Sequence, residues 1–488
     1  MPLLENRLIA RTLLSAGLLL GLLTSAGAAD KALLDILLEN GVVTQEQYDE
    51  LLEQETLTSD DILGTPEPEE SASVDPATAE TEDYIEAAVA DAVAEQIEEE
   101  FTVNASHGSS GFRLETRDGK WQTNLQWRAQ FRYYDNYSGD PRQLDDFAAP
   151  EVSNFENRRL RMKIGGHGFE PWLQYYFEVD LQPSRDPDAN AISSSARVID
   201  WRVDVAKWDW GGIRLGQWKI DMNRERVDSS GRQQFVERSI VNRVFTIDRQ
   251  VGIQLRGHLF QETAADMRYY IGAFSGGGRG VRNESNALMY SGRLQWNFLG
   301  RDLPWRQTDV DFTEQPTASL AIGGATTQGP CTRWSSSGCG RLDGFASPVT
   351  ATSTQFKVEQ AVQEFAFKYR GLSIQQEFHR KYIDDRVEGN RSDLTGAYVQ
   401  TGYFFNNIIP AVPAPLELAV RYAFVEEPNE VNRMFENERT ELTFAANWFF
   451  SGHNNKITVD YSFLTMDDGL TGLDDDGNRL RLQWDVSF

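Results

Sequence analysis

The end of the chain alternates apolar and polar side chains without interruption and stops on an aromatic residue. Leu480, Leu482, Trp484, Val486 and Phe488 fall on one face, and polar side chains fall on the other. A two-residue period is that of a β-strand with one apolar and one wet face. In a chain with many such segments, it favours a transmembrane barrel, whose strands alternate apolar outside and polar inside.

From Trp121 onward the same period recurs in sixteen segments, which predicts sixteen antiparallel strands. An even number returns the chain to its starting side and closes the sheet, so that lipid meets no unpaired edge. The expected fold class is all-β: a 16-stranded antiparallel transmembrane β-barrel over residues 110–488, preceded by a small α-helical N-terminal segment.

The lengths of the links between the segments follow a simple rule. Long links follow odd-numbered strands, at residues 135–155, 220–248 and 326–357, and short turns follow most even-numbered strands. The links 300–315 and 406–413 depart from this rule. Short turns inside and long loops outside are typical of outer-membrane barrels. We therefore expect a periplasmic N-terminal region and external long loops.

The first residues predict export. Arg7 and Arg11 precede an apolar run over residues 13–23, and small residues follow over 25–29. This order is that of a secretory signal peptide, which we expect to cover residues 1–29. No later stretch has the ~18 consecutive apolar residues of a spanning helix, so a membrane-embedded mature protein must span as a barrel.

The segment before the barrel is strongly acidic. Residues 30–100 hold 23 Asp and Glu against the single Lys31, which accounts for most of the net charge of −27. Helical spacing predicts a helical hairpin over 30–55, an acidic linker over 56–80 and an acidic helix over 81–105. The apolar stripe of that helix fits a short coiled coil. A tether without self-association fits equally well.

Two cysteines enclose a short Ser- and Gly-rich segment in an external link. In an oxidising compartment Cys331 and Cys339 are expected to form a disulfide. A two-cysteine zinc site would lack nearby histidine ligands. We therefore expect no metal site here.

Alternation also identifies the side chains that face the barrel interior. Many are basic, and 36 of the 44 basic residues after residue 100 are Arg, whose forked donors suit oxyanions. The link 220–248 adds five arginines and five acids. It forms a basic constriction only if the arginines point into the pore while the acids pair or face the wall.

The segment from Ile213 to Gly257 resembles the phosphate-selective porin O and P family. Its motifs are Gly216-Gln217-Trp218-Lys219, Glu237-Arg238-Ser239 and Arg249-Gln250-Val251-Gly252. Trp218 stands where the family usually has Phe. The resemblance extends over about residues 110–488. It implies a trimeric outer-membrane porin with a third loop folded inward and basic residues along the pore.

No motif for catalysis or cofactor binding is present. The five histidines are scattered, and neither a nucleotide-binding loop nor a nucleophile elbow occurs. We expect neither an enzyme nor a cofactor nor a nucleic-acid partner. The acids near 467–476 lack the spacing of a calcium loop, and the run 276–280 reads as a flexible turn.

The sequence thus predicts passive diffusion of anions, phosphate, pyrophosphate or similar, across the bacterial outer membrane. Lipid, lipopolysaccharide and two further copies of the chain are the expected partners. A general diffusion porin of weak selectivity and a barrel that tethers the envelope stay open as alternatives. The predicted anion-binding or pore-lining residues are Arg128, Arg132, Arg159, Arg161, Lys163, Lys219, Arg224, Arg226, Arg238, Arg243, Arg479 and Arg481.

Overall fold

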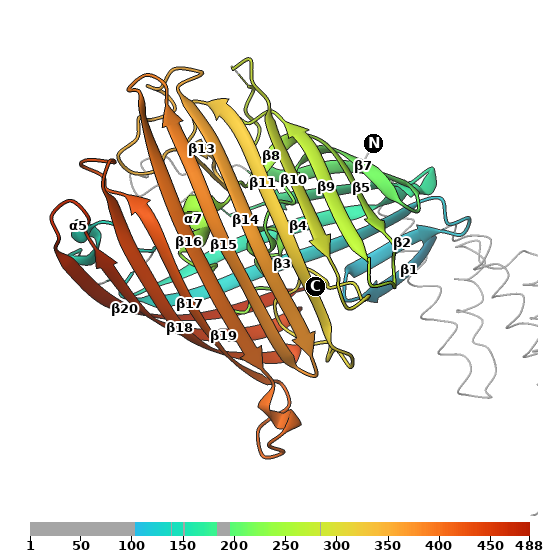
Figure 1. Cartoon of the computed structure of the whole chain (residues 1–488). Coiled ribbons are helices and arrows are strands. Elements are labelled where there is room, and N and C mark those ends of the chain that lie inside the picture. Colours follow the sequence, from blue (N-terminus) through green and yellow to red (C-terminus); the bar gives the residue numbers. More distant parts are fainter. Residues whose placement is uncertain (1–102, 138, 150–151, 183–195, 284) are drawn as a thin grey trace, which may run out of the picture. The chain divides into compact units, whose positions relative to one another are not determined.

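A closed antiparallel barrel of sixteen strands dominates the computed structural model of the chain, which confirms the predicted fold class (Figure 1). The structure describes residues 103–137, 139–149, 152–182, 196–283 and 285–488. The signal peptide, helical hairpin and linker predicted over 1–29, 30–55 and 56–80 lie outside the described residues. So does the predicted helix 81–105, except for its last three residues, which belong to a strand.

Each barrel strand pairs with the next, and the last pairs with the first. The strands are β3 (Gln122–Asp135), β4 (Asn154–Gly168), β5 (Glu170–Asp180), β6 (Arg197–Trp208), β7 (Gly211–Lys219), β8 (Arg249–Leu259), β9 (Met267–Phe274), β10 (Met289–Trp296), β11 (Thr317–Gly329), β14 (Phe356–Tyr369), β15 (Leu372–Asp385), β16 (Asn390–Tyr403), β17 (Leu416–Pro428), β18 (Glu436–Ser451), β19 (Asn455–Asp467) and β20 (Asp474–Ser487). The closing register between β20 and β3 runs from Leu480 opposite Asp135 to Ser487 opposite Arg128.

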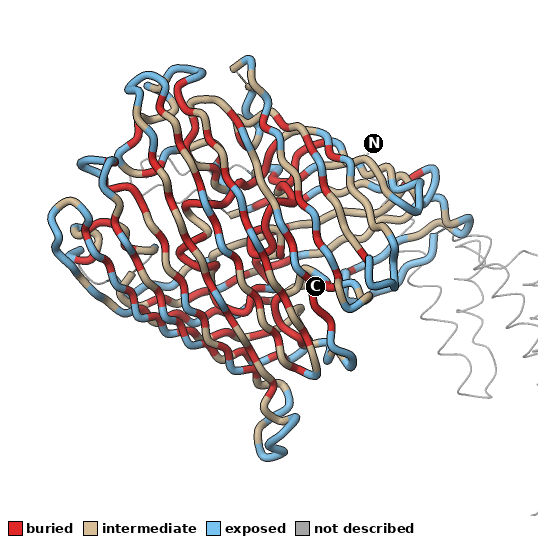
Figure 2. The backbone as a smooth tube through the Cα atoms, viewed as in Figure 1, coloured by how far each residue is buried: buried red, intermediate tan, exposed pale blue. Residues whose placement is uncertain are grey.

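The two faces of the wall differ as the alternation predicts. Along β20, Leu482 and Trp484 are 39% and 46% exposed on the outer face, whereas Arg481 and Asp485 are 4% and 1% exposed inside. Buried and exposed positions alternate along most strands (Figure 2). Among the described residues, no helix has the length and hydropathy to cross a membrane.

A short hairpin precedes the barrel and was not predicted. It consists of β1 (Val103–Gly108) and β2 (Gly111–Thr116). β2 pairs with the start of β3, from Phe112 opposite Leu125 to Glu115 opposite Gln122, on the edge that β20 leaves free beyond its end. The hairpin therefore extends the pairing of β3 past the last residue of the chain.

The links carry the remaining elements. The helix α5 (Leu144–Phe147) lies between β3 and β4, and the helices α6 (Arg224–Val227) and α7 (Val241–Phe245) lie between β7 and β8. The short strands β12 (Arg333–Ser335) and β13 (Gly338–Gly340) lie between β11 and β14. The 3-10 helix η1 (Phe405–Asn407) lies between β16 and β17. We name residues 220–248 loop 3, 275–288 loop 4 and 330–355 loop 5. Cys331 and Cys339 are joined by a disulfide at the base of the β12–β13 hairpin.

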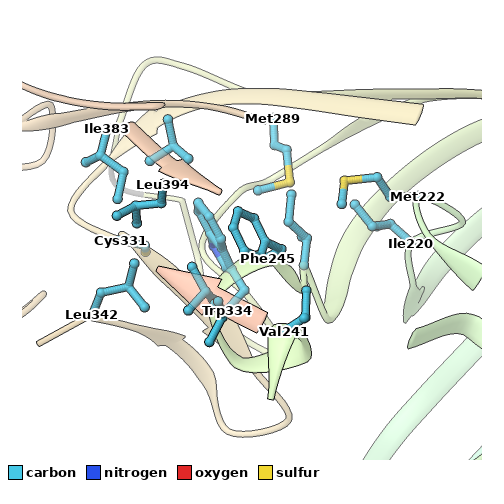
Figure 3. Close-up of a cluster of buried hydrophobic side chains, with 14 of the residues drawn as sticks. Ile220, Met222, Val241, Phe245, Met289, Cys331, Trp334, Leu342, Ile383 and Leu394 are labelled. Atoms are coloured by element: carbon cyan, nitrogen blue, oxygen red, sulfur yellow. The ribbon is translucent and has the colours of Figure 1, made fainter. Parts of the chain in front are cut away.

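An apolar core lies inside the barrel, where the alternation predicts polar side chains. Loop 3 contributes Val241 and Phe245, loop 5 contributes Trp334, and inward positions of β15 and β16 contribute Ile383 and Leu394 (Figure 3). All five are at most 2% exposed. These inward apolar residues are covered by the two loops and never meet the water of the lumen, which explains the exception.

Candidate functional site

Loop 3 lies against one side of the barrel interior and is fixed there by carboxylates of the wall. Its main-chain N–H groups donate to four of them: Arg224 to Glu364 (3.0 Å), Glu225 to Glu377 (2.6 Å), Val236 to Asp460 (2.9 Å) and Ile240 to Glu441 (3.1 Å). These acids belong to β14, β15, β18 and β19. Glu364, Glu441 and Asp460 also pair with arginines of the wall, so these acids are engaged by the loop and by the wall.

Two buried lysines hold the loop from the same wall. Lys456 Nζ donates to the Gln233 carbonyl at 2.5 Å. Lys381 Nζ donates to the carbonyls of Val244 in loop 3 (2.8 Å) and Thr332 in loop 5 (2.6 Å). Lys381 therefore ties the two loops together at the apolar core.

A cavity of 480 Å³ lies between loop 3 and the opposite wall, toward the long links. Among the described residues, fifteen basic side chains line it, against the three acids Asp140, Asp180 and Glu237. The basic residues are Arg132, Arg142, Arg158, Arg159, Arg161, Arg197, Lys219, Arg226, Arg238, Arg243, Arg249, Arg279, Arg333, Arg479 and Arg481. We call this space the upper cavity.

A second cavity of 710 Å³ lies toward the short turns, and we call it the lower cavity. Ser109 and Ser110, at the turn of the β1–β2 hairpin, lie at its border together with Gln122 and His167. Seven Lys and Arg side chains and four carboxylates line it. Its lining is therefore more balanced in charge than that of the upper cavity.

Of the residues that the structure describes, only Arg161 and Lys219 line both cavities, which places them where the two spaces meet. Arg161 is paired with Glu178 at 2.8 Å. Lys219 Nζ donates to the carbonyls of Arg226 (3.2 Å) and Asp228 (3.3 Å). Among the described residues, no carboxylate lies within 4.0 Å of it, and the two main-chain carbonyls hold this basic group at the junction.

Arg238 is a second basic residue without an ion-pair partner beside the junction among the described residues. Its guanidinium donates to the carbonyls of Glu225 (2.8 Å) and Asp228 (2.7 Å), and none of the described carboxylates pairs with it. Burial and the neighbouring Arg226 lower the pKa of Arg238 to about 10. It is therefore still a cation at neutral pH, and its charge is free to act on an anion.

Glu237 of loop 3 offsets part of the basic charge. It accepts Arg158 Nε (2.7 Å) and Arg132 Nη2 (2.8 Å), and Arg159 lies 3.5 Å away. Burial raises the pKa of Glu237, but the three guanidinium groups lower it more strongly, to well below 4.5. Glu156 also lies 3.6 Å from Arg132 and 4.0 Å from Arg158, so three guanidinium groups share two carboxylates and the cluster keeps a positive excess.

The remaining acids of the region are similarly engaged. Asp248, at the end of loop 3, accepts from Arg226 and lies 3.4 Å from Arg249. Arg249 also pairs with Asp200 at 2.8 Å. The acids thus lie in pairs or against the wall, the arrangement that a basic channel requires.

The structure brings most of the predicted residues together. Nine of the twelve line the upper cavity: Arg132, Arg159, Arg161, Lys219, Arg226, Arg238, Arg243, Arg479 and Arg481. Lys163 lines the lower cavity. Arg128 and Arg224 line neither: Arg128 pairs with Asp485 (3.1 Å), and Arg224 donates to the Pro304 carbonyl (2.7 Å). Both are at most 3% exposed, and both hold segments in place.

Six further basic residues of the upper cavity, among them Arg142 in the link between β3 and β4, were missed by the sequence reasoning. Arg158 turns inward because the β3–β4 register shifts opposite Gln130 and Phe131, so Arg158 lacks a partner in the ladder. Arg249 is the first residue of the third motif, and it could have been identified from its place at the start of β8. For Arg197, Arg279 and Arg333, no local signal indicated an inward position.

A closed barrel with polar cavities on both sides of a loop folded into its lumen defines the porin class of outer-membrane channels. The profile of the phosphate-selective porin O and P family matches residues 131–488, and the chain belongs to this family. Family and fold indicate a channel rather than an enzyme.

Comparison with solved structures finds porins of low sequence identity. The chain is similar to the loop L8 deletion mutant of OmpT of Vibrio cholerae (12% identity, 75% of this chain and 99% of that chain, TM-score 0.46). It is also similar to an anion-selective porin from Comamonas acidovorans (10%, 75% and 99%, 0.46) and to the outer-membrane channel DcaP of Acinetobacter baumannii (11%, 75% and 97%, 0.46). The identities are too low to transfer a substrate. No curated protein matches the sequence.

Proposed function

We propose that this porin is a passive channel for anions, with phosphate or related oxyanions preferred, and that loop 3 forms its basic constriction. The observation that carries the proposal is the upper cavity, lined by fifteen basic and three acidic side chains and joined to the lower cavity at Arg161 and Lys219. Inside a low-dielectric wall, such a lining lowers the free energy of an anion and raises that of a cation.

The chemical nature of the lining favours oxyanions over halides. Fourteen of the fifteen basic side chains of the upper cavity are Arg. A guanidinium group donates two parallel N–H bonds to a pair of oxygens, which chloride cannot accept in the same way. A phosphate in the cavity therefore recovers more of its dehydration cost through these hydrogen bonds than a chloride does, and it should reside longer.

The proposal includes the place and assembly of the channel. In this proposal the long links face the outside and the N-terminal region is periplasmic. Lipopolysaccharide surrounds the outer wall of the barrel, and three copies of the chain assemble into a trimer. It also includes the pore-lining role of the ten predicted residues that line the cavities and the presence of a signal peptide. The short-turn and long-link asymmetry supports the orientation. Family membership supports the trimer.

Phosphate titration of the chloride current through the purified full-length protein in planar bilayers tests the preference. We expect phosphate to reduce the chloride current at sub-molar concentrations, because residence in the basic cavity blocks smaller anions. An anion current that phosphate does not reduce would leave only a general diffusion porin. Absence of any conductance would favour the tethering barrel.

The pH dependence of the channel follows from Glu225, which lies in loop 3 and accepts from Ser239 N at 2.7 Å. Burial and the nearby Glu377 raise the pKa of Glu225 from 4.5 to about 7. The folded loop therefore binds a proton that the unpacked loop loses near pH 4.5, so its packing weakens as the pH rises from 5 to 8. We expect open-channel current noise to increase over this interval.

The Glu225→Gln variant provides the matched measurement, because its amide cannot ionise. Its current noise should change less between pH 5 and pH 8 than that of the unmodified channel. A variant with the same pH-dependent noise as the unmodified channel would show that another group is responsible.

A further inference from the structure

The link between β16 and β17 exposes apolar side chains at the end of the barrel where the short turns lie. Residues 408–414 read Ile-Ile-Pro-Ala-Val-Pro-Ala, and no charged side chain occurs from Leu394 to Leu416. Ile408 and Ile409 are 64% and 47% exposed. The link projects beyond the ends of the neighbouring strands (Figure 1). We call residues 408–414 the apolar arm.

The other long link at this end of the barrel has the opposite character. Residues 300–315, between β10 and β11, carry the charged side chains of Arg301, Asp302, Arg306, Asp309, Asp311 and Glu314. This link is bonded to loop 3, because Gln307 Nε2 donates to Gln233 Oε1 at 2.9 Å. Of these two links, only the apolar arm presents a continuous apolar surface to its surroundings, and such a surface marks an interaction site.

The base of the apolar arm is fixed to the barrel. The ring of Phe404 lies 5.6 Å from the ring of Phe449, and both side chains are buried. Asn407 Nδ2 donates to the Arg370 carbonyl at 3.2 Å, and Phe404 N donates to the Gly371 carbonyl at 3.3 Å. These contacts tie the arm to β18 and to the turn between β14 and β15, so its position relative to the wall is defined.

The backbone of the apolar arm satisfies most of its donors without water. The N–H groups of Ile408 and Ile409 donate to the Phe405 carbonyl at 3.1 Å and 2.8 Å, and Val412 N donates to the Ile409 carbonyl at 2.9 Å. The two prolines of the arm have no N–H group. Lipid cannot accept hydrogen bonds from a backbone, so a turn that bonds internally is suited to a lipid environment.

The apolar arm also continues the lipid-facing surface of the barrel. The ring of Tyr403 packs against that of Phe405 at 5.1 Å directly before the arm, and Leu418, 44% exposed on β17, follows it. Beside the base of the arm, the exposed Arg370 places its guanidinium 5.4 Å from the centre of the Tyr369 ring. Aromatic rings and a cation at the end of an apolar band are typical of the membrane–water interface, where the cation reaches the lipid phosphates.

We infer that the apolar arm is a lipid anchor, which inserts into the bilayer leaflet next to the short turns and fixes how deep the barrel sits in the membrane. Insertion removes the isoleucine, valine and proline side chains of the arm from water, and this burial favours the inserted state. The anchor acts on lipid and is independent of which ions pass through the channel.

Nitroxide labels on the variants Ile408→Cys and Val412→Cys test the anchor in the full-length protein, reconstituted in vesicles of phosphatidylethanolamine and phosphatidylglycerol. Power-saturation electron paramagnetic resonance compares the access of oxygen, which concentrates in lipid, with that of a water-soluble nickel chelate. We expect both labels to favour oxygen, at a depth of about 5–10 Å inside the lipid phosphates. The native cysteines do not take the label, because they are joined in a disulfide.

Ala265→Cys is the matched control, because Ala265 is a small exposed residue in the link between β8 and β9, at the same end of the barrel. Its label should favour the nickel chelate. Ile322→Cys provides the lipid reference, because Ile322 is 64% exposed on the outer face of β11. Each variant should retain the β-sheet circular dichroism of the unmodified protein, which shows that the barrel is folded.

Two results would overturn the lipid anchor. Labels at both arm positions that favour the nickel chelate would place the arm in water. Labels that neither reagent reaches would place the arm against protein, such as a second copy of the chain.

Discussion

Replacing Lys219 by Glu should reduce the preference of the channel for anions by at least about tenfold in the permeability ratio. Lys219 lines both cavities, and its ammonium group has no carboxylate partner among the described residues. The change replaces a basic side chain with a carboxylate at the junction. At the effective dielectric of a protein wall, a negative charge at a few ångströms is worth several kcal/mol to a passing ion, and tenfold needs only ~1.4 kcal/mol.

The measurement is the reversal potential of Lys219→Glu in a KCl gradient, with Lys219→Arg retaining the charge. Lys357→Glu is the matched control, because Lys357 faces outward on β14, pairs with Glu359 and is far from the lining. Lys219→Arg and Lys357→Glu should keep the original reversal potential. An unchanged value in Lys219→Glu would remove Lys219 from the pore.

Replacing Phe245 by Ala should open the channel and weaken its selectivity without unfolding the barrel. Phe245 is fully buried, and its ring stacks on His379 of β15 at 5.1 Å between centroids. Truncating a buried Phe costs about 3–5 kcal/mol. Here the loss falls on the packing of loop 3 against the wall, because the ladder hydrogen bonds of the barrel do not involve this side chain. A loosened loop leaves a wider and less basic path.

Single-channel conductance and reversal potential measure the effect of Phe245→Ala. The conductance should rise about twofold or more, since the loop and wall together set the narrow section. Phe450→Ala is the control, because Phe450 is 57% exposed on the outer face. If Phe245→Ala conducted and selected like the unmodified channel, loop 3 would not form the constriction.

The barrel could be predicted from the sequence because each strand carries its own signal. Trp121 to Tyr133, and Leu480 to Phe488, alternate strictly, and strand pairing then follows from chain order. The β1–β2 hairpin was not predicted, because its strands have only six residues each and are mostly exposed, so they give little periodicity.

The candidate site was only partly predictable, because it depends on contacts between distant segments. Inward direction follows from alternation, which gave Arg159 and Arg481. Alternation does not show whether a charge is free or paired. Arg128, for example, is paired with Asp485, which lies more than 350 residues away in the sequence. The shift at Arg158 and the apolar interior positions Ile383 and Leu394 likewise depend on loops that the period of a strand cannot reveal.

The reversal potential of the unmodified full-length channel in a KCl gradient tests the central claim most directly. With fifteen basic and three acidic side chains around the upper cavity, the account predicts a potential of the sign that marks chloride as the more permeant ion. A potential of the opposite sign, showing preference for potassium, would contradict it.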